Sequence, residues 1–474
     1  MSLNRRSFLK IAGAGTALGI INPNIVLAVP SKGGKNANMP KYETLKFDVA
    51  VVGAGAAGIP AAISAAREGA KVVLIEEDQQ PGGAPVDMYI TFICGAPRVG
   101  IYNDLIQELN AKHTLSGKPV ETFGRYGMDG KNHWWHPTAY LMVLNKFMRE
   151  EKNLTLMCGA PVVETLVSTG GKRNIVRGVR IMRNGVLQDI EASVVIDATG
   201  SGLVSSQAGC EYMYGRESMR DFNENIGLEV TDGKVQPCTW MIISQRIRKD
   251  AVLPRHKLRG GVVEDNLDKW VMPNEMDEMI KRDAGIYLHW GTTVHCKNTL
   301  DTVALADAQR ECLEKIQPDI EAMEEAGFAV YVAPKMGVRE ARRIRGEYIL
   351  SATDLQQGKM PYDKVVDAWY DLDPWGMKLT KEQKQIPPYG IPYRSLIPLN
   401  TEGLLTAGRI ISGTHIAASS YRVQPICSSI GEAAGVAAAM TALNKTKVRD
   451  INVKELIQRL DEKGMFEGLR NKRN

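Results

Sequence analysis

The sequence lacks the motifs of several enzyme classes. Its seven cysteines include no C-x-x-C pair, which argues against a zinc ribbon, a disulfide framework or a dithiol redox centre. It contains no G-x-S-x-G turn and no P-loop lysine, so acyl and phosphoryl transfer have little support. His133-Trp134-Trp135-His136 could offer two metal ligands, but a metal site needs three or four, and no cysteine or carboxylate lies nearby. We therefore expect no metal and expect most cysteines to be buried apolar side chains.

The charge balance gives no reason to expect nucleic acid or an anionic membrane as a partner. The net charge of the 474 residues is +5, and residues 1–28 hold three basic and no acidic residues, which leaves +2 without them. Beyond the N-terminal segment we find no apolar run long enough to cross a bilayer. We therefore expect no stable membrane insertion once that segment is removed.

The N-terminus resembles a bacterial twin-arginine export signal. Arg5-Arg6 precedes a glycine-rich apolar run that ends near Ala28, where small residues could be cleaved. An amphipathic helix is the alternative, but Asn22-Pro23-Asn24 would break it, and the first acidic residue is Glu43. We expect a signal peptide at the N-terminus and a periplasmic or extracytoplasmic protein.

Residues 48–76 predict a dinucleotide-binding βαβ unit. An apolar strand leads into Gly53-Ala54-Gly55-Ala56-Ala57-Gly58, then a helix, then a second strand that ends at Glu76. The glycines allow a tight turn, a close approach of the backbone to a pyrophosphate and close helix packing, and the helix N-terminus favours negative charge. Glu76 follows Gly58 by 18 residues and can accept hydrogen bonds from a ribose hydroxyl. Pro60 fits only within the first helical turn.

Three later segments place glycines or small residues where a ligand could cross the chain. They are Gly82-Gly83 after the second strand, Asp197-Ala198-Thr199-Gly200 at the end of another strand, and Ala407-Gly408-Arg409 at the end of a third. The chain then reaches Gln424-Pro425 and a helix rich in glycine and alanine over residues 431–439. With Pro425 in its first turn, this helix can direct free N–H groups at negative charge.

These segments, together with Met336–Ile344 and Ile391–Pro398, resemble the FAD-dependent oxidoreductase family over nearly all of residues 46–441. The family is a branch of the glutathione reductase and succinate dehydrogenase flavoprotein superfamily. The resemblance implies an α/β fold in which a Rossmann-like, GR2-type FAD-binding domain is built from discontinuous segments, with an α+β substrate or cap insert whose sheet closes the pocket. No H-x-x-C feature points to covalent attachment, so we expect noncovalent FAD. The expected parts are a signal peptide (1–28), a linker (29–45), the FAD-binding domain (46–200 and 389–445), the cap (201–388) and a C-terminal helix or tail (446–474).

The motif and the resemblance together imply a set of cofactor-binding residues, with Val162 contacting the adenine through its backbone. They are Gly53, Gly55, Ala57, Gly58, Glu76, Gly82, Gly83, Val162, Ala198, Thr199, Gly200, Gly408, Arg409, Gln424 and Pro425.

Residues 413–422 are expected to form a loop beside the flavin ring. The segment resembles the His-Gly segment of succinate dehydrogenase flavoproteins, whose histidine helps to bind substrate. His415 matches that histidine, whereas Ile416 replaces the glycine and Ser419 the arginine, which argues against a dicarboxylate substrate. His415 is a candidate proton carrier, although a packing role is an equal alternative.

Four more residues complete the catalytic candidates. Arg422 could hold an anionic substrate or a pyrophosphate in a two-pronged hydrogen bond, and Tyr421 precedes it. Tyr393 and Arg394 are placed near the flavin by the family pattern.

Other polar clusters allow two interpretations. The arginines between Arg339 and Arg345, with Glu340, could bind an anion or form an ion-pair network that attaches the cap, and charge runs favour the network. The His133–His136 segment is interpreted as an aromatic edge beside the cofactor or substrate entrance, and His289 and His295 as candidates for lining a pocket.

The sequence therefore predicts an exported FAD-dependent oxidoreductase that transfers a hydride between a small organic substrate and flavin N5, with a quinone or redox protein as electron acceptor. The absence of a second G-x-G-x-x-G motif argues against a disulfide reductase. A flavin-bearing electron-transfer or binding subunit without its own turnover is the alternative. The insert of nearly 190 residues (201–388) favours an enclosed pocket and hence an enzyme.

Overall fold

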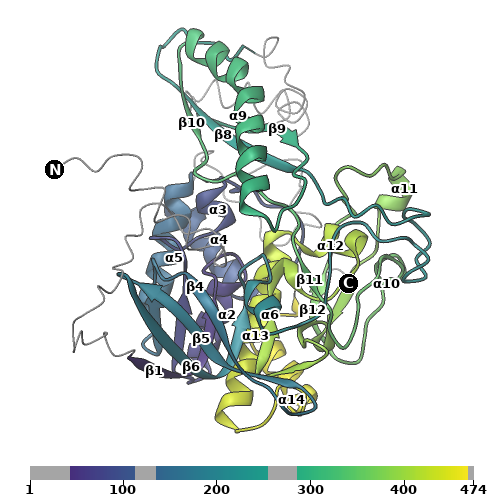
Figure 1. The fold of residues 1–474 in the computed structure, drawn as a ribbon. Helices are drawn as coiled ribbons and strands as arrows, with labels where there is room; N and C mark the ends of the chain where they lie inside the picture. Colours follow the sequence, from purple (N-terminus) through teal and green to yellow (C-terminus); the bar gives the residue numbers. More distant parts are fainter. Residues whose placement is uncertain (1–42, 113–134, 255–285, 468–474) are drawn as a thin grey trace, which may run out of the picture.

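The computed structural model describes residues 43–112, 135–254 and 286–467. Its main feature is an eight-stranded mixed sheet with the order β14-β5-β6-β1-β2-β3, in which β15 also pairs with β6 and β4 with β5 (Figure 1). The strands are β1 (Thr44–Val52), β2 (Val72–Ile75), β3 (Leu154–Met157), β4 (Val162–Ser168), β5 (Asn174–Arg183), β6 (Val186–Asp197), β14 (Thr401–Glu402) and β15 (Leu404–Thr406). Because β14 and β15 come from the C-terminal part of the chain, the expected α/β sheet of discontinuous segments is confirmed.

The register brings the ends of four parallel strands together. Val52 of β1 pairs with Ile75 of β2 and with Asp197 of β6, and Asp197 pairs with Thr406 of β15. The chain leaves each of these strands through one of the predicted glycine or small-residue segments. Ligands of open α/β sheets bind at such carboxyl ends, so the fold gathers the predicted cofactor segments at one edge.

Two helices pack closely on this sheet, α2 (Gly58–Arg67) and α13 (Gln424–Leu443). A Cβ on Gly431 would come within 2.0 Å of the Ala57 carbonyl oxygen, and one on Gly435 within 2.2 Å of a backbone oxygen of α2, so only glycine permits this approach. By length and composition α13 could cross a membrane, contrary to the expectation that no such run follows the N-terminal segment. However, 89% of its most apolar stretch is buried in the fold, so α13 is a core helix.

The expected cap sheet is formed by three antiparallel strands in the order β10-β8-β9. They are β8 (Cys238–Arg246), β9 (Ile286–Val294) and β10 (Phe328–Val332), and the long helix α9 (Thr302–Glu325) packs on them. This unit stands at the top of the view in Figure 1, apart from the large sheet.

Shorter elements complete the described part of the chain. The helices are α3 (Ala84–Asp87), α4 (Gly100–Lys112), α5 (Pro137–Glu150), α6 (Leu203–Gln207), α10 (Ala352–Gln356), α11 (Lys381–Lys384), α12 (His415–Tyr421) and α14 (Val453–Glu462), with the 3-10 turns η1 (Tyr393–Leu396) and η2 (Gly408–Ile410). Two strand pairs join β7 (Tyr212–Met213) to β11 (Arg343–Ile344) and β12 (Lys364–Ala368) to β13 (Tyr389–Pro392). All seven cysteines are free, and six of them are buried.

The prediction of a loop at residues 413–422 is wrong, because most of this segment forms helix α12. Thr414 caps the helix, its hydroxyl accepting a hydrogen bond from the Ala417 N–H. Within the helix, Ser419 donates its hydroxyl to the Ile416 carbonyl at 2.6 Å. Polar residues of this kind favour loops unless their hydroxyls are satisfied within the helix.

Candidate cofactor and substrate site

Two adjoining cavities lie at the carboxyl ends of the parallel strands. The first, of about 230 Å³, is lined by the glycine turn after β1, by Glu76 and by the turns after β6 and β15, and we call it the nucleotide cavity. The second, of about 140 Å³, reaches strand β8, and we call it the cap cavity. Both cavities are lined by Ala84, Met88, Arg409, Arg422 and Gln424. These five residues therefore form the boundary between a nucleotide-like space and a space covered by the cap.

The glycines of the nucleotide cavity permit close backbone contacts. Gly83 has φ +56°, and a Cβ there would lie 2.8 Å from the Gly55 Cα. Gly53 has φ +98°, and its Cβ would lie 2.6 Å from the Ala198 carbonyl oxygen. A side chain at these positions would fill the space over the N-terminus of α2, where the first N–H groups of a helix have no intrahelical partner.

Glu76 is held in place by backbone donors at the tip of β2. Its Oε2 accepts a hydrogen bond from the Ala54 N–H at 2.6 Å and its Oε1 one from the Asp78 N–H at 3.0 Å. Burial raises the pKa of the Glu76 carboxyl, although these two hydrogen bonds oppose the shift. The carboxylate is thus preorganised at the edge of the nucleotide cavity.

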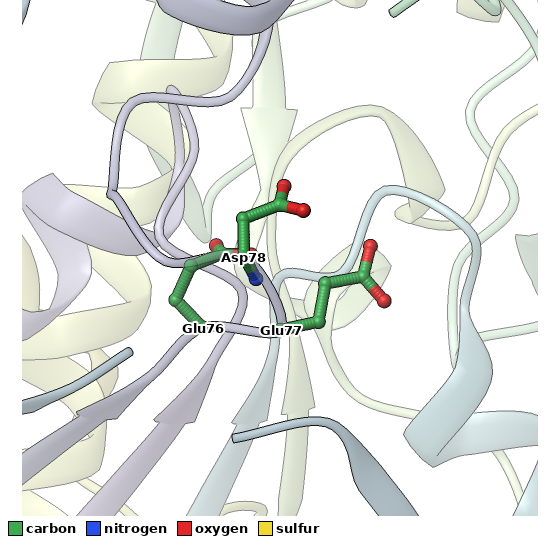
Figure 2. A group of neighbouring side chains, drawn as sticks. All are labelled: Glu76, Glu77 and Asp78. Carbon is green, nitrogen blue, oxygen red and sulfur yellow. Dashed lines mark hydrogen bonds between the residues drawn. The ribbon is translucent and has the colours of Figure 1, made fainter. Parts of the chain in front are cut away.

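Glu76, Glu77 and Asp78 form an acidic group with oxygens within 4.8 Å of one another (Figure 2). Asp78 forms an ion pair with Lys335, and Glu77 is largely exposed. Because Glu76 already accepts from two backbone N–H groups and Asp78 has a lysine partner, we interpret the group as the ribose end of the nucleotide cavity.

The turn after β6 is fixed by a buried carboxylate. Asp197 accepts hydrogen bonds from the N–H and hydroxyl of both Thr199 and Ser205. These contacts hold Ala198 to Gly200 across the strand tip. The Asp197 side chain itself does not line the nucleotide cavity, so it positions the turn and does not face a ligand.

Helix α13 starts at the boundary of the two cavities. Val423 is its N-cap residue and offers no side-chain hydrogen bond, and Pro425 lies in the first turn as expected. Gln424 donates its side-chain amide to the Ile90 carbonyl, while its Oε1 is buried without a partner. The first-turn N–H groups can therefore serve a ligand with negative charge.

Most predicted cofactor residues line the nucleotide cavity. They are Gly53, Gly55, Ala57, Glu76, Gly83, Val162, Ala198, Thr199, Gly200, Gly408, Arg409 and Gln424. Gly58, Gly82 and Pro425 do not line it. A Cβ on Gly58 would lie 1.7 Å from the Gly53 carbonyl oxygen, and one on Gly82 would collide with Val86, so both glycines serve packing.

Of the catalytic candidates, Arg422 alone lines the cavities. His415 is 1% exposed and its Nδ1 contacts Glu340, and the Tyr421 hydroxyl donates to the Ile411 carbonyl. Helix α12 turns both side chains into the core, and neither lines a cavity, so their catalytic role stays a prediction.

Tyr393 and Arg394 also lie away from both cavities. The buried Tyr393 hydroxyl donates to the Val448 carbonyl at 2.8 Å, and Arg394 forms a two-pronged pair with Asp363. Turn η1 directs both side chains toward structural partners, so the structure does not bring them to the cofactor edge.

The arginine-rich segment divides between the two expected roles. Arg343 is buried and pairs with Glu340 and Glu217, which is the network interpretation. Arg345 pairs with Glu211 at the surface. Arg339, by contrast, lines the cap cavity.

The aromatic and histidine candidates do not line either cavity. Trp135 is 1% exposed and packs edge-on against Tyr140, and His136 caps α5, so the entrance interpretation is wrong for both. His133 and Trp134 lie outside the described residues. His289 is buried against Ser244, with Nε2 2.6 Å from the hydroxyl, and His295 is exposed. His289 is enclosed because β9 packs on β8 and α9, whereas His295 follows β9 and faces solvent.

Sequence reasoning missed most of the cap cavity. Its lining includes Met88, Ile90, Phe92, Thr239, Met241, Tyr370, Asp373 and Trp375. These residues come from several distant segments without a shared motif. Only their convergence in the fold identifies them.

The donor set fits FAD. Gly55 and Gly83 lie close together without side chains, which leaves space over the N-terminus of α2 for a pyrophosphate. Glu76 presents a fixed hydrogen-bond acceptor to a ribose. Gln424 and the start of α13 offer polar groups at the boundary to the cap cavity, where the reactive ring would lie.

Comparison with known proteins agrees with this geometry. A model of the FAD dependent oxidoreductase family matches residues 48–460. A curated relative, Protein FixC of Bradyrhizobium diazoefficiens, is 30% identical over 179 residues, which cover 35% of this chain and 39% of that protein. The chain thus spans about two-fifths of the length of that relative.

Solved structures show a likeness at low sequence identity. A geranylgeranyl bacteriochlorophyll reductase-like protein of Thermoplasma acidophilum is 13% identical with a TM-score of 0.42, over 88% of this chain and 83% of that chain. E. coli quinol fumarate reductase FrdA is 14% identical with a TM-score of 0.36, over 90% and 75%.

Proposed function

Because the chain belongs to the FAD-dependent oxidoreductase family and is therefore an FAD enzyme, we propose that it transfers a hydride between a small organic substrate and flavin N5, with noncovalently bound FAD. A quinone or a redox protein is the proposed electron acceptor. The observation that carries this proposal is the pair of adjoining cavities with a shared wall at Arg409, Arg422 and Gln424.

The residues of the nucleotide cavity have distinct roles in this proposal. Bound FAD supplies the two-electron chemistry. The glycine turn and the N-terminus of α2 bind the pyrophosphate, and Glu76 binds the ribose. The N-terminus of α13 stabilises negative charge at the ring edge through its dipole and free N–H groups. Arg422, at the boundary, binds an anionic group of the substrate or of the cofactor.

The cap cavity makes an enzyme the better interpretation than a subunit without turnover. Strand β8 contributes Thr239 and Met241 to its wall, so the cap covers a space beside the cofactor cavity. A space covered by the cap can shield hydride transfer to a small molecule from bulk water.

An absorption spectrum and an anaerobic reduction experiment test the proposal. The purified protein should be yellow, and acid should release its FAD. Small organic substrates should then bleach the flavin anaerobically, and a soluble quinone should restore the colour. A colourless protein that takes up no FAD would contradict the proposal. A flavoprotein that is reduced by redox proteins and by no small molecule would instead support an electron-transfer subunit.

We further propose that the protein is exported by the twin-arginine route to the periplasm. The support is Arg5-Arg6 ahead of a glycine-rich apolar run without acidic residues. That route carries folded proteins, which suits a noncovalent cofactor loaded inside the cell. In cell fractionation, Arg5→Lys with Arg6→Lys should retain the protein in the cytoplasm. Unchanged export of the double variant would contradict the route.

A further inference from the structure

The cap cavity holds more positive than negative charge. Its lining contains one acidic residue, Asp373, and three basic residues, which are Arg339, Arg409 and Arg422. Burial raises the pKa of the Cys94 thiol to about 12, and burial also holds the pKa of Tyr370 well above its ordinary value, so neither adds negative charge at neutral pH. The wall therefore carries a net charge of about +2 in a partly desolvated space, which favours an anionic ligand.

Arg339 is the arginine that faces only the cap cavity. Arg409 and Arg422 also line the nucleotide cavity, where FAD can balance part of their charge, whereas Arg339 does not. Among the ion pairs of the described residues, none contains Arg339. Burial, and after it the charge of Arg422, lower the pKa of the Arg339 guanidinium to about 9. A negatively charged ligand beside Arg339 would favour the charged guanidinium and so raise its pKa again.

The guanidinium of Arg339 is held in one orientation. It donates to the Pro237 carbonyl and to the Thr239 hydroxyl, both at 2.6 Å, and it lies 4.1 Å from the centroid of the Trp375 ring. Trp375 in turn donates its indole N–H to Asp373 at 2.6 Å. The bonds of Arg339 to Pro237 and Thr239 both come from its Nη1 atom. The other guanidinium nitrogens of Arg339 therefore keep donors for a ligand.

Asp373 links this arginine to the boundary of the cavities. Its carboxylate also lies 3.4 Å from Nη2 of Arg422, whose Nε is buried without a hydrogen-bond partner in the described part of the chain. Trp375 and Asp373 are thus positioning residues that hold two guanidinium groups against one cavity. Two fixed guanidinium groups with unused donors match the two oxygens of one carboxylate.

Much of the remaining lining is apolar, and the cavity leaves little room. Met88, Ile90, Phe92, Met241 and Val338 supply apolar surface, and the cavity volume is about 140 Å³. That volume is below the range of about 300–1,000 Å³ typical of sites for drug-sized ligands. The ligand should therefore be small, with an apolar body.

We propose that the cap cavity binds a small organic acid whose carboxylate is held by Arg339 and Arg422 and whose apolar body contacts the methionine and aromatic side chains. The proposal rests on the proposed function, because it names the class of molecule that occupies the substrate side of the FAD site.

Titration of the FAD-loaded protein with acid and amide pairs tests this inference. Benzoate and hexanoate are compared with benzamide and hexanamide, which have the same shapes without the charge, at constant ionic strength. The readout is the perturbation of the flavin absorption spectrum, with the shift in Tm as a second measure. At least one acid should bind at least about tenfold more tightly than its amide, the size expected for a hydrogen-bonded charge.

Variants then assign the effect to Arg339. Arg339→Met should weaken binding of the acid at least about tenfold and leave the amide nearly unaffected, and Arg339→Lys should give an intermediate loss because the two-pronged geometry is removed. Arg345→Met is the matched control, since this exposed arginine of the same segment pairs with Glu211 at the surface.

The outcomes separate the two proposals. Equal binding of acids and amides by the wild-type protein would overturn the inference, and so would an Arg339→Met protein that retains FAD and binds the acid as before. Either result leaves the FAD function intact. Failure to load FAD at all would instead contradict the proposed function. The wild-type comparison decides the matter even if Arg339→Met does not fold.

Discussion

The Nδ1 atom of His415 lies 2.9 Å from Oε2 of Glu340, inside a buried network that also contains Arg343 and Glu217. Burial by itself would raise the pKa of the Glu340 carboxyl, but the charges of His415 and Arg343 outweigh it and hold the pKa below its ordinary value. The network joins the start of α12 to the segment before β11. Its side chains line neither cavity, and their ion pairs stabilise the fold beside the site.

Glu340→Gln should destabilise the protein in a pH-dependent way. At pH 7 the change leaves Arg343 with less compensation in the core, and loss of a partner in a buried pair costs roughly 3–5 kcal/mol. Because the folded pKa of Glu340 is lowered from 4.5, its stabilising contribution is present above pH 4.5 and is lost as the pH falls through the folded pKa. The difference in Tm between the two proteins should therefore be largest at pH 7 and should narrow in acid.

Glu211→Gln is the control for this prediction. Glu211 also pairs with an arginine of the same segment, Arg345, but both side chains are about half exposed. An exposed pair contributes about 0–1 kcal/mol, so Tm should change little. Equal losses of Tm in the two variants would contradict a special role of the buried network.

Gly83→Ala should abolish FAD binding or reduce it strongly. The new Cβ would lie 2.8 Å from the Gly55 Cα, and the backbone at φ +56° disfavours a side chain. Gly185→Ala is the matched control, since Gly185 has φ +74° with no atom near its Cβ, and it should cost only the backbone strain of about 1–2 kcal/mol. FAD content per folded protein, from the absorbance ratio at 450 and 280 nm, distinguishes the two. Normal FAD content in Gly83→Ala would rule out the close approach as a requirement for binding.

Glu76→Gln should weaken FAD binding by roughly 10- to 100-fold, because hydrogen bonds to a charged group contribute about 1.5–3 kcal/mol. Glu77→Gln should have little effect, since the neighbouring Glu77 is largely exposed and, among the described residues, pairs only with Lys335 at 3.9 Å. Flavin fluorescence on titration of the apoprotein gives both dissociation constants. Similar values for the two variants would show that the acidic group acts only through its overall charge.

Glu432→Gln should stabilise the protein at alkaline pH. Glu432 is 4% exposed in α13, and burial, opposed by a hydrogen bond from the Ile101 N–H, raises its pKa from 4.5 to about 7. With a raised folded pKa, the contribution of this acid to stability is fully present below pH 4.5 and is lost as the pH rises through about 7. The shift of about 2.5 pKa units corresponds to at most roughly 3.5 kcal/mol at about 1.4 kcal/mol per unit.

The measurement for Glu432 is Tm at pH 4.5 and pH 8.5. The variant and the wild type should agree at the lower pH, and the variant should have the higher Tm at the upper pH. A variant that is less stable at pH 8.5 would show that the ionised carboxylate is stabilised by Arg67 and Lys463, whose charges lower its pKa, more strongly than burial destabilises it.

The predicted cofactor residues depended on local backbone requirements, and these are readable from the sequence. A turn with φ above zero favours glycine, and a position with another segment of the chain within 3 Å of a Cβ excludes larger residues, so Gly53 and Gly83 mark such places without knowledge of the partner. Glu76 was found because the length of a βαβ unit determines where its second strand ends. The same local reasoning explains why Pro425 was placed correctly in the first turn of α13.

Side-chain roles that depend on distant partners were not readable in this way. His415 is buried because Glu340, 75 residues earlier, lies against it, and the motif around His415 contains no sign of that contact. Helix α13 has the composition of a membrane span and is a core helix because α2 and the sheet cover it. Trp135 fills the core and does not line an entrance, since Tyr140 packs against it.

The sequence by itself therefore determined where the glycine turns suited to a nucleotide lie at strand ends, because those turns restrict residue type through local geometry. Only the tertiary structure decided which side chains line the nucleotide cavity and the cap cavity. Arg339, Asp373 and Arg422 come together from three separated segments, and their shared electrostatic environment exists only after the cap has folded onto the sheet. Charge and burial are properties of the assembled surroundings, whereas backbone conformation is largely a property of the residue.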